Sequence, residues 1–147
     1  MEYNGKQCTV ETWDASEGKM KVSFDTSVVM AEFQAALKQQ LAKRGLLVKE
    51  SSEEALIQVR CRFIRINEGN RFLRHIHLSM FGFGNAVIEV DGELIVGGEK
   101  VADLEVTARK GNNFHFFGGS GKVLLIRCAK DCAKKISKKV ISGLKRA

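Results

Sequence analysis

Three histidines are the side chains in this sequence best suited to metal chemistry. His75 and His77 stand two positions apart in "RHIH" and point the same way if that segment is extended, and His115 follows later. Three imidazoles can hold a zinc ion and leave a fourth position open for water or substrate. No Asp, Glu or Cys stands at ligand spacing beside them, however. We keep the three histidines as weak metal candidates, and we expect no metal and no other cofactor.

Four cysteines offer thiol chemistry: Cys8, Cys61, Cys128 and Cys132. They contain no Cys-x-x-Cys pair, so their spacing fits neither a zinc finger nor a thioredoxin-type redox motif. Cys128 and Cys132 stand one turn apart on a predicted helix, which is a poor geometry for a disulfide. We expect free thiols that pack as small apolar side chains. A bridge from Cys61 to a helix cysteine is the alternative if the protein is exported.

Glycine-rich stretches raise the question of phosphate binding and catalysis. The stretch "GGSGK" lacks the first Gly of a P-loop at the required spacing and the Ser or Thr after Lys122. Gly118–Gly121 precede a predicted helix, whose N-terminus could attract an anion. A loop that leads into a helix explains these glycines as well. No nucleophile elbow or dinucleotide fingerprint is present. We name no catalytic residue and expect that the chain is not an enzyme.

The positive charge of the chain is concentrated at one end. The formal net charge is +7, and residues 121–147 contain nine Lys or Arg and a single acid, Asp131. Such a helix could lie on an anionic membrane or follow a phosphate backbone, with Lys130, Lys134, Lys138 and Lys145 as the binding residues. It also carries an apolar stripe, which indicates that it packs on a core with its lysines solvated. No aromatic residue stands among the lysines, so we do not favour nucleic acid as a partner.

Phenylalanines are dense in two glycine-rich stretches, "FGFGN" at 81–85 and "NNFHFFGGSG" at 112–121. Their rings could pack together over the edge of a sheet as a satellite cluster. They could instead form an exposed apolar patch that binds a partner. Both explanations stay open. The partner-binding candidates are Phe81, Phe83, Phe114, Phe116 and Phe117.

Hydrophobic periodicity predicts the elements that must position these residues. The chain has 147 residues, 44% of them hydrophobic, and no proline, which is typical of one globular domain. Apolar residues at four-residue steps predict helices over 28–44 and 121–146. Alternation predicts strands at 19–25, near 46–50, and over 56–66, 86–96 and 101–109. No apolar run approaches the roughly 18 residues that a membrane span needs.

The predicted fold class is therefore α/β (α+β), in the order β-α-β-β-β-β-α. A single layer of mixed, mainly antiparallel sheet has two helices packed on one face. We expect one such domain over residues 19–147, preceded by an N-terminal segment, 1–18, that could be poorly ordered. The polar positions of 56–66 are basic and those of 86–96 are acidic, which predicts local ion pairs on the outer face.

Four segments in a fixed order carry a family resemblance: "LAKRGLLV", "RFLRHIHLSMFGFGNA", "VIEVDGELI" and "FFGGSGKVLLIRCAKDCAKKI". With them, residues 28 to 145 resemble a bacterial family of unknown function that contains many proteins predicted to be lipoproteins. The layout is also similar, in fold only, to small modules of envelope-assembly lipoproteins. Cys8 has no apolar segment before it, so a lipid anchor cannot be inferred.

The resemblance implies an exported, envelope-associated domain without established catalysis. We therefore expect a non-enzymatic interaction or assembly module of the bacterial cell envelope. Its partner would be an unknown protein or a second copy of the chain. We expect a periplasmic or envelope location, close to a membrane, with the cytoplasm as the alternative because "MEYNGKQC" has no signal-peptide pattern. The alternative function is binding to an anionic surface through the basic helix.

Overall fold

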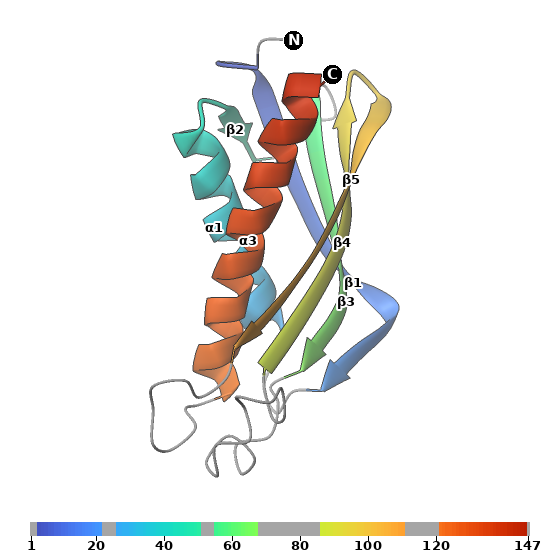
Figure 1. Ribbon diagram of the computed structural model, residues 1–147, viewed down its shortest axis with the longest axis vertical. Coiled ribbons are helices and arrows are strands. Elements are labelled where there is room, and N and C mark those ends of the chain that lie inside the picture. The colour runs from blue at the N-terminus through green and yellow to red at the C-terminus, as the bar shows by residue number, and fades with distance from the viewer. Residues whose placement is uncertain (1–2, 22–25, 51–54, 68–85, 111–120, 147) are drawn as a thin grey trace.

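A computed structural model describes residues 3–21, 26–50, 55–67, 86–110 and 121–146, and the side chains of these residues except those of 14–21, 121 and 122. Within these described residues, two helices and five strands follow one another (Figure 1). They are β1 (Gln7–Lys21), α1 (Ser27–Lys43), β2 (Leu47–Lys49), β3 (Ile57–Asn67), β4 (Ala86–Val96), β5 (Glu99–Lys110) and α3 (Gly121–Arg146).

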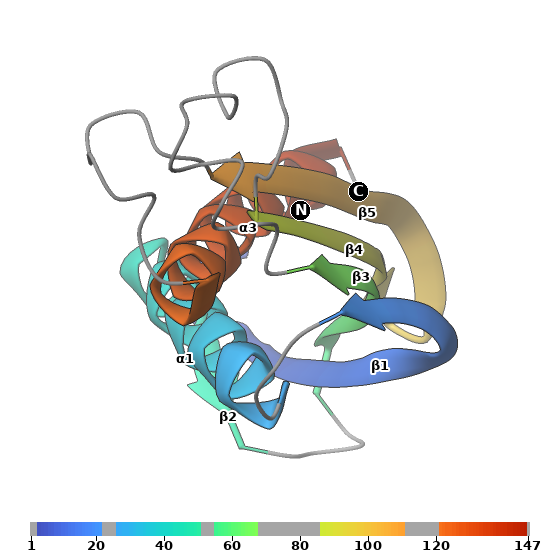
Figure 2. The same cartoon turned by 90° about the horizontal axis from the view of Figure 1, so that it is seen from below.

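The five strands form one mixed sheet in the order β2-β1-β3-β4-β5. β1 pairs in parallel with both β2 and β3. The chain then continues as an antiparallel meander through β4 and β5. Both helices lie on the same face of the curved sheet (Figure 2). The predicted class, a mixed sheet with two helices on one face, is confirmed.

The N-terminal part of the chain departs from the prediction. The sequence predicts a first strand that starts at Lys19, after an N-terminal segment, 1–18, that could be poorly ordered, but β1 already begins at Gln7. Residues 7–18 thus lie inside the sheet, between β2 and β3. Cys8 and Val10 are buried, and the hydroxyl of Thr12 donates a hydrogen bond to Gln34 Oε1 of α1 at 3.0 Å. Residues 22–25 of the expected strand lie outside the described residues.

Helix α1 packs on the sheet through one apolar row. Val29, Phe33, Leu37 and Leu41 are fully buried at four-residue steps, as the periodicity predicts. The ring of Phe33 meets that of Phe63 on β3 edge to face, with centroids 5.0 Å apart, a favoured aromatic geometry. The helix ends at Lys43, and Gly45, just beyond the C-cap residue Arg44, has the left-handed φ of +98° expected of a glycine that terminates a helix.

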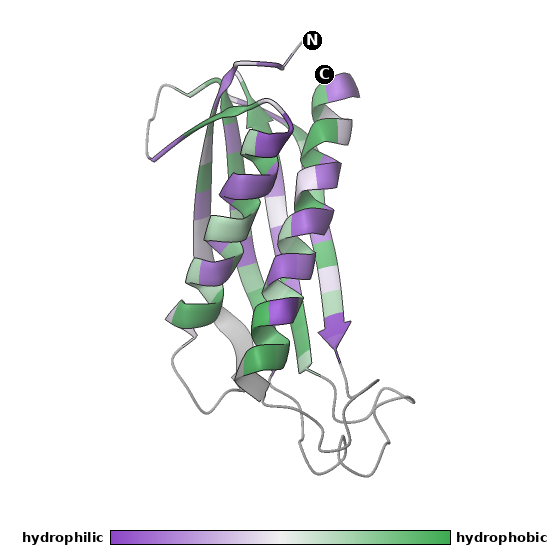
Figure 3. Cartoon of the chain, turned by 90° about the vertical axis from the view of Figure 1, so that its left-hand side faces the viewer, coloured by the Kyte–Doolittle hydropathy of each residue, from purple (hydrophilic) through white to green (hydrophobic). Residues whose placement is uncertain are grey.

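The 26-residue helix α3 forms the other half of the helical layer. Its whole predicted apolar stripe is buried: Leu125, Cys128, Ala129, Cys132, Ile136, Val140 and Leu144. Gly143 lets the last turns approach the sheet closely, because a Cβ at this position would lie 2.8 Å from Leu94 Cδ2. Neither helix of the described chain is long and apolar enough to span a membrane. Figure 3 shows the polar residues of α3 on its outer surface.

Two lysines of α3 occupy the free edge of the sheet. β5 is an edge strand of 12 residues, and an uncovered edge invites pairing with another chain. Lys135 Nζ donates to the backbone oxygen of Thr107 at 2.9 Å, and Lys139 Nζ donates to that of Glu105. These ammonium groups satisfy carbonyls that a foreign strand would otherwise use. We infer that they protect the edge.

Substituting Ile136 with Asp tests the packing of α3. The side chain is fully buried, so the variant places an unpaired carboxylate in the core. We expect the free energy of unfolding to fall by about 4 kcal/mol or more, or folding to fail. Urea titration followed by circular dichroism measures it. Ile136→Val is the matched control and should cost about 0.5–1.5 kcal/mol. Wild-type stability of the Asp variant would contradict the packing described here.

Replacing Lys135 and Lys139 together with Ala tests the protected edge. We expect the free energy of unfolding to change by less than about 1 kcal/mol, because both side chains are partly exposed. Aggregation at elevated temperature, measured by light scattering, should become faster because the edge carbonyls are uncovered.

The control for this test is the double variant Lys134→Ala with Lys138→Ala. It removes the same charge from exposed positions on the same helix. If both double variants aggregate at the same rate, net charge explains the effect and the edge contacts do not.

Candidate functional site

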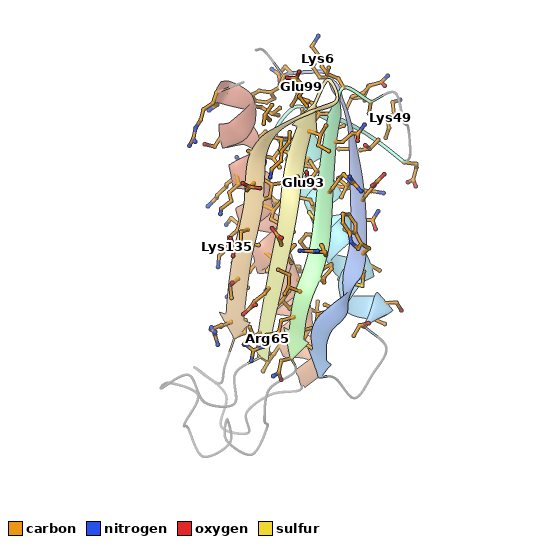
Figure 4. The ribbon with its side chains drawn as sticks, turned by 90° about the vertical axis from the view of Figure 1, so that its right-hand side faces the viewer. Lys6, Lys49, Arg65, Glu93, Glu99 and Lys135 are labelled. Carbon is orange, nitrogen blue, oxygen red and sulfur yellow. The ribbon has the colours of Figure 1, made fainter. Side chains whose placement is uncertain are left out.

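One face of the sheet is not covered by either helix (Figure 4). The side chains that β1, β3, β4 and β5 direct away from the helices lie on this open face. Charged residues dominate it, in contrast to the apolar inner face. Because paired strands hold their residues in fixed register, these side chains form rows that run across the sheet.

Two rows are central to the open face. In the first, Glu11 of β1 lies beside Arg60 of β3, which lies opposite Glu93 of β4. In the second, Trp13 lies beside Arg62, which lies opposite Asp91. The basic strand β3 thus lies beside the acidic strand β4, as the sequence predicts, and beside Glu11 of β1, which the sequence analysis did not place.

Ion pairs join neighbouring strands on the open face, and those between β3 and β4 were predicted. Arg62 Nη2 lies 3.1 Å from Asp91 Oδ2, and Arg65 Nη1 lies 3.6 Å from Glu89 Oε1. Arg60 Nε lies 3.3 Å from Glu11 Oε2, an ion pair without the alignment of a hydrogen bond. Each of these side chains is at least 33% exposed. Each pair therefore contributes only about 0–1 kcal/mol to stability. Their main effect is to hold long side chains in defined positions.

Trp13 is the one large aromatic side chain exposed among the described residues, at 36%. The guanidinium carbon of Arg60 lies 5.2 Å from the centre of its ring, a cation–π contact. Arg60 of β3 therefore contacts both Trp13 and Glu11 of the neighbouring strand β1. Such an arrangement restricts the rotamers of three large side chains before any partner arrives, which lowers the entropy cost of binding.

A shallow hollow of about 220 Å³ lies over the middle of the open face. Trp13, Arg60 and Arg62 line one side of it, and Asp91, Glu93, Lys100 and Asp103 line the other. Its lining is polar and open to solvent, so it can receive side chains of a partner. It lacks the enclosed apolar character of a typical small-molecule pocket.

Four carboxylates meet where β4 pairs with β5. Asp91 stands directly opposite Glu105, and Glu93 stands directly opposite Asp103. Like charges directly across a strand pair are destabilising. We call Asp91, Glu93, Asp103 and Glu105 the acidic quartet.

Only part of the charge of the acidic quartet is neutralised within the described chain. Arg62 pairs with Asp91, and Lys100 Nζ lies 2.6 Å from Asp103 Oδ1. Within the described residues, Glu93 and Glu105 form no ion pair. The hydrogen bond to Asp103 raises the pKa of Lys100, and Glu93 and Asp91 add to the rise. The quartet is therefore a site that favours additional cations.

The thiols are placed for packing and not for chemistry. All four cysteines are free and buried, as the sequence analysis favours. Burial raises the pKa of each thiol from its ordinary 9.0 to about 12. Cys128 and Cys132 direct their sulfur atoms toward the backbone oxygens of Ala86 and Ile88. The thiols stay protonated at neutral pH, so they lack the thiolate that nucleophilic attack and metal binding require.

The structure places the four lysine candidates together and leaves the other sequence candidates undescribed. Lys130, Lys134, Lys138 and Lys145 are all exposed on α3. The five candidate phenylalanines and the three histidines lie outside the described residues. Within the described residues, no group of His, Cys, Asp or Glu side chains is arranged to hold a metal ion.

The sequence analysis missed Trp13 and Glu11 as surface residues. Their signal was the alternation in "QCTVETW", in which the apolar Cys8 and Val10 occupy every second position and Glu11 and Trp13 fall on the opposite face of a strand. Because no strand was predicted for this stretch, neither Glu11 nor Trp13 could be placed on a face of the sheet.

Comparison with known proteins identifies the fold and no family. No protein-family model matches the sequence, and a search of curated proteins finds no match. Protein XCC0632 from Xanthomonas campestris, of the family DUF330, has a TM-score of 0.63 at 9% identity, over 97% of this chain and 87% of that one. The PelC dodecamer from Paraburkholderia phytofirmans has a TM-score of 0.54 at 11% identity, over 91% and 88%.

A minor lipoprotein from Acinetobacter baumannii matches more loosely, with a TM-score of 0.49 at 12% identity, over 96% of this chain and 94% of that one. At 9% and 11% identity, XCC0632 and PelC show a shared fold alone. The predicted resemblance to a bacterial family of unknown function is thus supported in part, at the level of the fold through XCC0632.

The raised thiol pKa values predict how stability depends on pH. An unfolded thiol ionises near pH 9, whereas the native thiols stay protonated up to about pH 12. Above pH 9 the native state therefore binds more protons, and the free energy of unfolding falls as pH rises. For one thiol the loss between pH 8 and pH 10 is about 1.4 kcal/mol. Urea titrations under reducing conditions can measure it.

Cys128→Ala isolates this effect. The variant is less stable at every pH because it leaves a cavity, but its decline between pH 8 and pH 10 should be smaller than that of the wild type by about 1.4 kcal/mol. Ser142→Ala, at an exposed position of the same helix, should leave the decline unchanged. Parallel curves for wild type and Cys128→Ala would contradict the buried, protonated thiol.

Proposed function

We propose that this chain is a non-enzymatic interaction module of the bacterial cell envelope that associates with further copies of itself through the open face of its sheet. The observation that carries the proposal is the ordered set of large side chains on the sheet face that neither helix covers. Trp13, Arg60 and Arg62 line one hollow, and each is held by a neighbour on the next strand. Trp and Arg are the residue types that contribute most to binding at protein interfaces.

Several observations support assembly over catalysis. Two of the carboxylates that line the hollow are held in ion pairs, Asp91 by Arg62 and Asp103 by Lys100, and the thiols are buried and protonated. A protein of similar fold, PelC, is a dodecamer, so this type of fold is compatible with self-association. The envelope location rests on the sequence resemblance, with the cytoplasm as the alternative.

The phenylalanine-rich stretches remain a second predicted part of the contact surface. Phe81, Phe83, Phe114, Phe116 and Phe117 lie outside the described residues, so their role is still the hypothesis drawn from the sequence. Their substitution is a separate experiment from those on the open face.

A second candidate function is binding to an anionic surface through α3. The exposed row of Lys130, Lys134, Lys138 and Lys145 favours it. Because the apolar stripe of α3 is buried in the core, such binding would be electrostatic, without insertion into the bilayer. Binding to vesicles that contain phosphatidylserine, measured at two salt concentrations, tests this alternative.

Trp13→Ala tests the open face. If the face is the contact surface, we expect the dissociation constant for self-association to rise roughly tenfold or more, as for truncation of an interface hot spot. Sedimentation velocity over a concentration series measures it. Val28→Ala is the control, because Val28 has the same exposed fraction, 36%, on α1.

Two results would overturn the proposal. A wild-type protein that stays monomeric throughout the series would exclude self-association. Equal effects of Trp13→Ala and Val28→Ala would show that the open face is not the contact surface.

A further inference from the structure

Two surfaces of this protein carry opposite charge, and neither is fully neutralised within the described chain. The first is the acidic quartet of β4 and β5, where Glu93 and Glu105 lack ion-pair partners within the described residues. The second is the outer surface of α3. The only ion pair that α3 forms among the described residues joins Lys135 to Asp131, at 3.2 Å.

The lysines of α3 repel one another as they stand. Lys130, Lys134 and Lys138 follow at four-residue steps, so they lie on one line along the helix. Like charges at this spacing destabilise an isolated helix. All three are exposed, and none has a carboxylate partner in the part of the chain that the structure describes. We call these three residues the lysine row.

The lysine row and the acidic quartet lie on opposite sides of the molecule. Figures 3 and 4 view the chain from opposite sides, with the helices in front in one and the open sheet face in front in the other. One chain therefore cannot bring its own lysine row onto its own quartet. Both surfaces are available to a neighbour at the same time.

We propose, building on the proposed self-association, that the contact is head-to-tail: the lysine row of one copy docks on the acidic quartet of the next. The partner on the open face is thus a second copy of this chain. Docking places cations beside Glu93 and Glu105 and relieves the repulsion on both surfaces. The exposed ring of Trp13, in the same hollow, offers an additional contact to a lysine side chain.

The geometry determines the type of assembly. A contact between two different surfaces is heterologous, so it repeats from copy to copy and closes into a ring or continues as a filament. A face-to-face dimer would instead join two open faces on which arginines and carboxylates of β3 and β4 already pair within each chain. Charge complementarity between unlike surfaces therefore favours the head-to-tail arrangement over the symmetric dimer.

Charge reversal tests the proposal through two variants. The helix variant carries Lys130→Glu, Lys134→Glu and Lys138→Glu, and the sheet variant carries Glu93→Lys and Glu105→Lys. In each variant alone, the proposed contact would bring like charges together. Each should therefore raise the dissociation constant for self-association at least tenfold, measured by sedimentation velocity. An equimolar mixture should assemble again, because every contact then joins an acidic helix to a basic sheet or the reverse. One chain that carries all five substitutions should also assemble.

Controls separate this contact from general charge effects and from the proposed function. Lys49→Glu and Glu99→Lys change charge at exposed positions outside both surfaces, and they should assemble as the wild type does. Thermal unfolding verifies that all variants fold. Wild-type assembly should weaken as salt rises from 50 to 500 mM, since ions screen exposed charges.

Three outcomes would overturn the inference. If the mixture of folded variants does not assemble, the two surfaces do not meet. If Trp13→Ala impairs assembly but neither charge variant does, the open face is the contact surface and α3 is not its partner, so the proposed function stands without this inference. If the helix variant loses binding to phosphatidylserine vesicles but keeps normal self-association, the lysine row binds anionic lipid and not the quartet.

Discussion

The rest of the structure depends on the packing of the apolar stripe of α3 against one face of the sheet. Because the stripe is fully buried, the rotation of the helix about its axis is fixed. The lysines that alternate with the stripe must then face outward or toward the edge of β5. With α1 beside α3, the helical layer covers one face only (Figure 2). The polarity of the open face and the charge of the helical face both follow from this packing.

Elements with a regular pattern could be predicted from the sequence. The four-residue steps of Val29, Phe33 and Leu37 and the alternation of Ile57, Val59 and Cys61 each report a local geometry that burial then confirms. The place of the first strand in the sheet could not be predicted. Strand order is set by contacts between distant segments, and the pairing of Val10 with Val59 leaves no trace in either segment alone.

The surface proposed for assembly likewise combines features that the sequence predicts with features that depend on the fold. The basic character of β3 and the acidic character of β4 are visible in the sequence, and their ion pairs were predicted. The opposition of Asp91 to Glu105 depends on the register of β4 with β5, which includes an irregularity between Leu94 and Ile95. Trp13 joins the same surface only because β1 pairs with β3. A hollow lined by four strands is therefore a property of the topology and not of any one segment.

The position of β1 also bears on how the chain folds during synthesis. Both neighbours of this strand come later in the sequence, and both pair with it in parallel. When β1 leaves the ribosome, most of its hydrogen-bonding groups stay unpaired until β3 has been made, because β2 pairs only with Gln7, Cys8 and Thr9. Pairing between segments that are distant in the sequence is slow compared with helix formation, and unpaired strands of nascent chains aggregate readily. The topology therefore makes the delayed pairing of β1, in the interior of the sheet, a step of folding that is open to aggregation.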